Sequence, residues 1–149
     1  MNKGIVATGS KEATQAGAEI LRAGGNAFDA AVAAVFTSMT SEFALTGVGG
    51  GGAMMIRKSE SEPVLYDFFV DTPPRTGKEE LDFFGVEVDF GDSTQIFHIG
   101  KASAAVPGTL LGLVIIQEQF GLLPLSVVMD PAIHLAREGS VFVECRVGS

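Results

Sequence analysis

The spacing of apolar and polar residues predicts two helices in the first part of the chain. Between Ser10 and Gly24 the apolar positions fall on one helical face, at Ala13, Ala16, Gly17, Ile20 and Leu21. Ser10 is a typical N-cap residue, and Gly24 is typical of a helix end. Asn26 predicts the cap of a second helix, from Ala27 to about Met39, which is apolar on every side. Such a helix is expected to lie inside the protein.

Four short segments favour strands, one near the N-terminus and three in the middle of the chain. Short apolar segments predict strands at Gly4–Ala7, Ala53–Arg57, Val64–Phe69 and Thr94–Ile99. The second and third of these are joined by a polar turn, which predicts a hairpin, and their weak alternation indicates strands buried on both faces. Residues 75 to 93 have no clear period, and we expect a loop-rich excursion there.

Two further helices are expected towards the C-terminus. Pro107 is expected at the first position of a helix that runs to about Phe120. Asp130 and Pro131 resemble an N-cap followed by a first helical position, for a helix that ends before Gly139. Together these elements predict the α+β class, with residues 1–149 forming one portion of a domain.

A run of glycines follows the second helix and allows a nucleotide-binding interpretation. Gly47, Gly49 and Gly52 satisfy G-x-G-x-x-G, a pattern that binds a dinucleotide only where a strand enters and a helix follows. Because Ala53–Arg57 favours a strand, we prefer a glycine-lined entry into that strand. A nucleotide-binding domain stays open as an outside alternative.

Composition narrows the classes of function. The chain has 149 residues, of which 46% are hydrophobic, and a net charge of −8. It has no basic cluster, so no nucleic-acid partner is expected. The longest apolar run, Ala27–Met39, is too short to span a bilayer, so no membrane partner is expected. The single cysteine, Cys145, excludes an internal disulfide framework, and an inert thiol is expected. Because the opening residues also lack a signal-peptide pattern, we expect a cytoplasmic protein.

Residues with catalytic chemistry are scarce. His98 and His134 have no ligand at short spacing, so no metal site is predicted, and His134 is interpreted as a partly buried structural histidine. Asp67 lies among apolar residues and is either a catalytic group or a hydrogen-bonded buried acid, of which we favour the second. The residues alone therefore predict neither a complete active site nor a cofactor.

A series of motifs extends through nearly the whole chain. The matching segments are residues 13–17, 20–33, 49–52, 67–68, 105–109, 121–125 and 131–139. Their order and spacing resemble the N-terminal part of the large subunit in the γ-glutamyltransferase (γ-glutamyltranspeptidase) family.

The resemblance implies an N-terminal-nucleophile hydrolase with a four-layer α/β/β/α core, which cleaves itself into two subunits. The nucleophile would be the threonine at the N-terminus of the small subunit, activated by its own amine. The resemblance therefore places no catalytic residue in this chain. The implied partners are the rest of the large subunit, the small subunit and a small-molecule amide substrate.

One position departs from the family pattern. The family carries Asp-Phe-Arg, in which the arginine binds the α-carboxylate of the γ-glutamyl group, whereas this chain has Asp67-Phe68-Phe69. A phenyl ring cannot pair with a carboxylate, so the resemblance implies a substrate other than a standard γ-glutamyl amide. Phe69 is the predicted substrate-contacting residue, and Arg75 is a second candidate that could supply the missing charge. A non-catalytic family member, or a binding module that folds against a partner, is the alternative.

Overall fold

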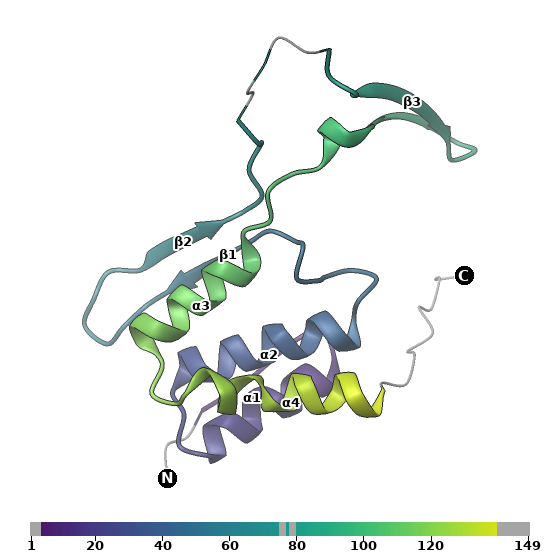
Figure 1. The fold of residues 1–149 in the computed structure, drawn as a ribbon. Coiled ribbons are helices and arrows are strands. Elements are labelled where there is room, and N and C mark those ends of the chain that lie inside the picture. Colours follow the sequence, from purple (N-terminus) through teal and green to yellow (C-terminus); the bar gives the residue numbers. More distant parts are fainter. Residues whose placement is uncertain (1–3, 75–76, 78–79, 140–149) are drawn as a thin grey trace.

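The computed structural model describes residues 4–74, 77 and 80–139, which contain both helices and strands (Figure 1). The α+β class is therefore confirmed. In chain order the elements are α1 (Lys11–Arg22), α2 (Ala27–Ser41), β1 (Gly52–Ile56), β2 (Val64–Phe68), β3 (Phe84–Asp89), β4 (Thr94–Ile99), the 3-10 turn η1 (Lys101–Ser103), α3 (Thr109–Phe120) and α4 (Leu125–Glu138).

The first two helices begin at the residues that the sequence predicts. The Ser10 side chain accepts a hydrogen bond from the Ala13 N–H, and the Asn26 side chain accepts from the N–H groups of Phe28 and Asp29. Each bond satisfies a backbone donor that has no partner within its own helix. Both predicted caps are confirmed.

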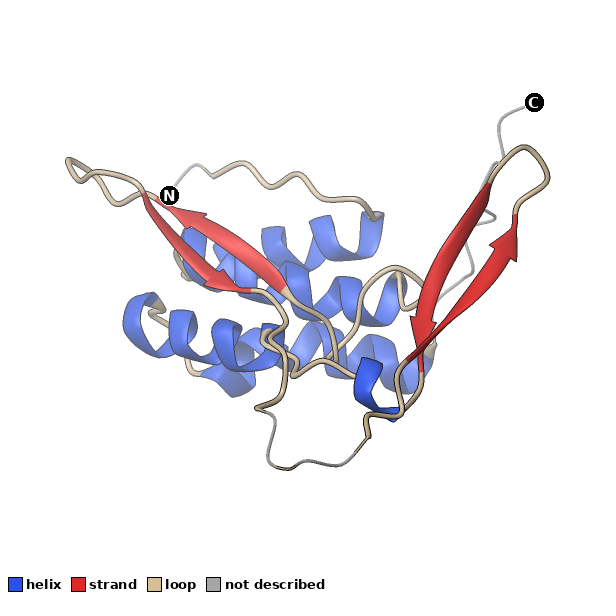
Figure 2. Cartoon of the chain, turned by 90° about the horizontal axis from the view of Figure 1, so that it is seen from above, coloured by secondary structure: helices blue, strands red, loops and turns tan. Residues whose placement is uncertain are grey.

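Helix α2 lies at the centre of the hydrophobic core. Its Val32 and Ala33 are completely buried, as are Leu113 of α3 and Val128 of α4. Figure 2 shows the helices gathered into one body on which the first hairpin lies. The prediction that α2 is an internal helix is confirmed, and its alanines allow its neighbours to approach closely.

Strands β1 and β2 form the predicted antiparallel hairpin, in which Gly52 pairs with Phe68 and Ile56 with Val64. The prediction that both faces are buried is wrong for this chain. Helix α3 covers one face, and on the other face Met55 and Leu65 are more than half exposed. Among the described residues, no other element covers that second face.

The prediction of a loop-rich excursion at residues 75–93 is wrong in part. Phe84–Asp89 forms β3, which pairs antiparallel with the predicted strand β4. Figure 1 shows this second hairpin projecting away from the helices. We call the described residues 72–74, 77 and 80–105 the arm, and residues 4–71 with 106–139 the body. The residues of β3 do alternate between apolar and polar, but the sequence prediction missed this strand because residues 75–93 as a whole have no clear period.

One predicted strand is absent from the described residues, and two predicted helices begin at other residues. Residues Gly4–Ala7 form no strand, since no neighbouring strand pairs with them among the described residues. Helix α3 begins at Thr109, with Gly108 as its N-cap, so Pro107 precedes the helix. Helix α4 begins at Leu125 and includes Pro131 in its interior. The apolar face of α4 that packs on α2 outweighs the local preference of the proline for a helix start.

None of the helices that the structure describes is long and apolar enough to cross a membrane. The described part of the chain has a helical body, one two-stranded sheet that lies on it, and the projecting second hairpin.

Candidate functional site

The C-terminal end of β2 lies against three glycine-containing segments. The ring of Phe68 contacts Gly52 and Gly112, and the backbone carbonyl of Phe68 lies beside Gly108. A Cβ atom on Gly112 would collide with that ring, and one on Gly51 would lie only 2.5 Å from the Val70 nitrogen. The glycines therefore allow the end of β2 to pass directly over the N-terminal part of α3.

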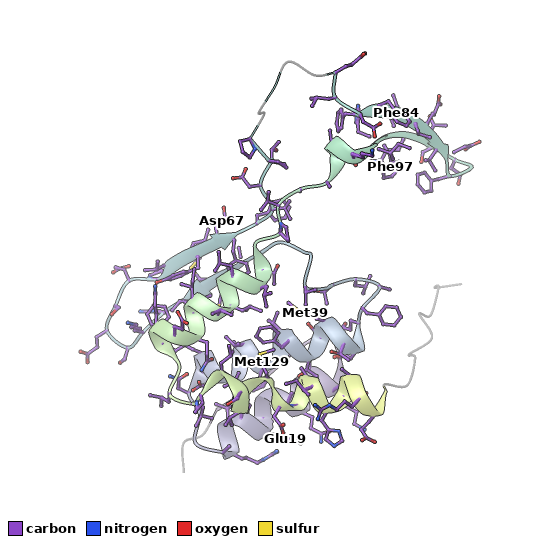
Figure 3. The ribbon with its side chains drawn as sticks, in the orientation of Figure 1. Glu19, Met39, Asp67, Phe84, Phe97 and Met129 are labelled. Atoms are coloured by element: carbon purple, nitrogen blue, oxygen red, sulfur yellow. The ribbon has the colours of Figure 1, made fainter. Side chains whose placement is uncertain are left out.

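Because Phe68 points to α3, the two-residue period of a strand turns Asp67 and Phe69 to the opposite side. Phe69 is 68% exposed, and Asp67 is exposed as well (Figure 3). One oxygen of Asp67 accepts a hydrogen bond from the Phe69 N–H at 2.9 Å. The interpretation of Asp67 as a buried acid is wrong, since no described element covers its side of the hairpin.

Backbone hydrogen bonds fix this region on both sides. Asp71 and Val106 exchange two of them, at 3.1 and 2.7 Å, where the arm leaves the body and returns to it. The Thr109 N–H donates to the Gly50 carbonyl at 3.2 Å, which joins the glycine run to the start of α3. The position of Phe69 is therefore set by a strand, a backbone bridge and a helix start.

The glycine run leads into a strand, as predicted. Gly50 closes a turn through its N–H, which donates to the Gly47 carbonyl, and β1 begins at Gly52. The dinucleotide pattern requires a helix immediately after the glycines, with its N-terminus directed at the pyrophosphate. Because β1 occupies that place, the geometry does not favour a dinucleotide site here.

The sequence analysis missed the main buried polar group, the carboxylate of Asp29, which is fully buried. It accepts hydrogen bonds from the Asn26 N–H at 2.7 Å and from the Gln117 side-chain amide at 2.6 Å. The backbone N–H groups of Leu122 and Leu123 also donate to it, at 3.1 and 3.2 Å. Asp29 therefore joins the start of α2 to α3 and to the turn that follows α3.

These contacts also determine the charge of Asp29. Burial raises the pKa of its carboxyl, but the hydrogen bonds from Asn26, Gln117, Leu122 and Leu123 outweigh burial and hold the pKa below the ordinary 3.8. The spacing of Asn26 and Asp29 is that of a capping box, and this signal could have revealed the local half of the network. The other partners, Gln117 on α3 and Leu122 and Leu123 after it, are far from Asp29 in the sequence, so no local pattern indicates them.

The two histidines lie away from Phe69 and from each other. His98 stacks on Phe83 in the arm, with ring centroids 4.8 Å apart. His134 is exposed on α4 and lies 4.0 Å from Glu138, so its interpretation as a partly buried histidine is wrong. Within the part of the chain that the structure describes, no three His, Cys, Asp or Glu side chains are grouped to hold a metal ion.

Arg75 and Cys145, about which the sequence analysis also makes predictions, lie outside the described residues. Of the two predicted substrate-contacting residues, the structure therefore describes Phe69 alone.

Known proteins share this arrangement of helices and hairpins. A crystal structure of the transpeptidase CapD from Bacillus anthracis superposes with a TM-score of 0.76 and 26% identity, and the match covers 97% of this chain and 43% of that one. The body and the arm therefore define an α+β region found in a transpeptidase enzyme.

The sequence comparisons identify the family. The model of the gamma-glutamyltranspeptidase family matches residues 13–144, so the chain belongs to this family. The acylase ACY 1 proenzyme of Pseudomonas sp. (strain SE83) is 38% identical over 94% of this chain, and the glutathione hydrolase proenzyme of Escherichia coli (strain K12) is 35% identical over 93%. The chain spans about a quarter of the length of these relatives, 25% and 23% respectively.

Proposed function

We propose that this chain is the N-terminal portion of the large subunit of an amidohydrolase or acyltransferase, in which an N-terminal threonine outside residues 1–149 is the nucleophile. The whole enzyme would have the four-layer α/β/β/α core, act in the cytoplasm and cleave itself into two subunits. Membership of the family supports this proposal, because family relatives carry names such as acylase and glutathione hydrolase proenzyme.

The substrate of the proposed enzyme is an amide whose acyl group is uncharged where a γ-glutamyl group carries its α-carboxylate. The observation that carries this proposal is Phe69, which stands where the family pattern has arginine and is 68% exposed beside the end of β2. An unpaired carboxylate against a phenyl ring loses its hydration and gains no partner, which costs several kcal/mol. An apolar acyl group instead gains free energy from covering the ring.

The acylase relative supports the same substrate class, since it is named for acylase activity and not as a glutathione hydrolase. Arg75 is retained in the proposal as a second candidate, a cation that could pair with a charged acyl group. In the proposed enzyme, residues 1–149 contribute one wall of the substrate pocket and no catalytic group.

The first test is expression of the full polypeptide that contains this chain. We expect two fragments, the second beginning with threonine, and hydrolysis of a neutral acyl amide. Replacement of that threonine by alanine is the matched control and should abolish both cleavage and hydrolysis. A polypeptide that stays uncleaved and hydrolyses no amide would contradict the proposal and favour a non-catalytic family member.

A further inference from the structure

The N-terminus of α3 has no capping side chain. Its N-cap residue is Gly108, and its first turn contains no acidic residue. The Thr109 N–H donates to the Gly50 carbonyl, whereas the next two N–H groups, those of Leu110 and Leu111, have no acceptor among the described residues. Free N–H groups and the helix dipole make such a helix end attractive to an anion.

A buried hydroxyl lies at the same helix end. Thr109 is only 5% exposed, and its Oγ1 atom has no hydrogen-bond partner within the part of the chain that the structure describes. The hydroxyl faces the glycine turn, because a Cβ atom added to Gly50 would lie 3.8 Å from it. A buried polar group without a partner has lost its hydrogen bonds to water and gained none, so the Thr109 hydroxyl is a second, independent sign of a ligand.

The glycine turn leaves space beside this helix end, close to Phe69. Cβ atoms added to Gly47 or Gly49 would meet no atom within 4 Å. Figure 1 shows α3 beginning where the chain returns from the arm, at the end of β2. The backbone carbonyl of Phe69 would lie 2.9 Å from a Cβ atom on Gly108, so the N-terminus of α3 adjoins the residue that is proposed to contact the acyl group.

We propose that the start of α3 binds a carboxylate of the substrate, with the Thr109 hydroxyl and the N–H groups of Leu110 and Leu111 as donors. This inference rests on the proposed function, in which an uncharged acyl group lies against Phe69. The carboxylate therefore belongs to the other half of the amide, the amine that hydrolysis releases, and the substrate class is an acyl amide of an amino acid or peptide. The glycine turn covers the hydroxyl in the free chain, and the backbone freedom of its glycines lets it move aside when the carboxylate binds.

The first experiment compares two substrates of the full-length enzyme, N-hexanoylglycine and the same compound with its carboxylate converted to a carboxamide. We expect kcat/KM to be about tenfold or more higher for the carboxylate, and Thr109→Val to remove most of this preference, because a hydrogen bond to a charged group is lost. Thr109→Ser keeps the hydroxyl and is the matched control. Equal values for the two substrates in the unmodified enzyme, or a preference that Thr109→Val leaves intact, would overturn the inference.

A second measurement does not depend on activity. Butanoate added to the full-length protein should shift the amide NMR signals of Leu110 and Leu111, and butanamide, its uncharged control, should not. No shift with butanoate would overturn the inference, and an equal response to inorganic phosphate would indicate an adventitious ion only and would overturn it as well. A protein that binds butanoate here but hydrolyses no amide would contradict only the proposed function, and an active amidase without this binding would contradict only this inference.

Discussion

The body and the arm both contain an antiparallel hairpin, but the two hairpins are held in different ways. The β1–β2 hairpin lies on α3, where Phe68 packs against Gly112 without space for another atom. The β3–β4 hairpin is joined to the body through the bridge between Asp71 and Val106, and its apolar side chains are partly exposed. The same local pattern thus gives a hairpin that is fixed on a helix in one place and a hairpin whose apolar side chains are partly exposed in the other.

The largest expected effect is in the body, at Asp29. Asp29→Ala leaves the donors of Asn26, Gln117, Leu122 and Leu123 without their acceptor, and each such buried donor costs about 1–3 kcal/mol. We expect the free energy of unfolding of the full-length protein to fall by about 3 kcal/mol or more, as measured by urea denaturation. The matched control is Asp67→Ala, at an exposed carboxylate, which should change it by less than about 1 kcal/mol. Equal losses would mean that the network around Asp29 contributes no special stability.

The next largest loss of stability is expected at Gly112, and the same substitution at Gly47 is its control. Gly112→Ala puts a methyl group into the Phe68 ring and should lower the free energy of unfolding by about 1–3 kcal/mol. Gly47→Ala meets no atom within 4 Å and has no left-handed backbone, so we expect a change within about 0.5 kcal/mol. Thermal unfolding of both variants tests this prediction. An unaffected Gly112→Ala protein would show that the β1–β2 hairpin does not rest tightly on α3.

The pH dependence of stability provides a further test of Asp29. Because its pKa is lowered in the folded protein, its ionised form stabilises the fold at pH values above the unfolded pKa of about 3.8. This contribution is lost as the pH falls through the folded pKa. We expect the difference in urea midpoint between wild type and Asp29→Asn to be largest near pH 6 and to shrink below about pH 3.8. A constant difference would contradict the assignment of an ionised, hydrogen-bonded carboxylate.

The smallest effect is expected in the arm. Asp82 accepts a hydrogen bond from the Lys101 N–H at 3.1 Å through its side chain, at the base of the second hairpin. Asp82→Ala should cost about 0.5–1.5 kcal/mol of local stability, because this bond is exposed to water. Hydrogen exchange should then become faster in β3 and β4 but stay unchanged in α2. Faster exchange in α2 as well would show that the arm and the body unfold as one unit.

The sequence predicted the body better than the arm. The helical face from Ala13 to Leu21 and the caps Ser10 and Asn26 are local signals, so they predicted α1 and α2 correctly. Strand β3 was missed although its residues alternate between apolar and polar, because the alternation is short and lies in a longer segment, residues 75–93, that has no clear period. The start of α4 was placed at Pro131, with Asp130 as its N-cap, since the local preference of the proline was given more weight than packing on α2.

Part of the candidate site was also accessible from the sequence. Phe69 was singled out from the sequence, and the two-residue period of a strand places it on the same side of the hairpin as Asp67, while Phe68 packs on the other side, against α3. The exposure of Asp67 was not predicted, because residue types alone do not reveal which face of a hairpin is covered. The links from Asp29 to Gln117 and Leu122 connect distant parts of the chain, and no local pattern indicates them.

The most direct measurement of the proposed function is the ratio of kcat/KM for a γ-glutamyl amide to that for a neutral acyl amide, before and after Phe69→Arg in the full-length enzyme. We expect the unmodified enzyme to prefer the neutral amide, and the arginine to raise the ratio about ten- to a hundredfold through a charge-assisted contact with the α-carboxylate. Phe69→Leu is the matched control and should leave the ratio nearly unchanged. An unmodified enzyme that strongly prefers the γ-glutamyl amide, or a ratio that Phe69→Arg does not change, would contradict the proposed role of Phe69.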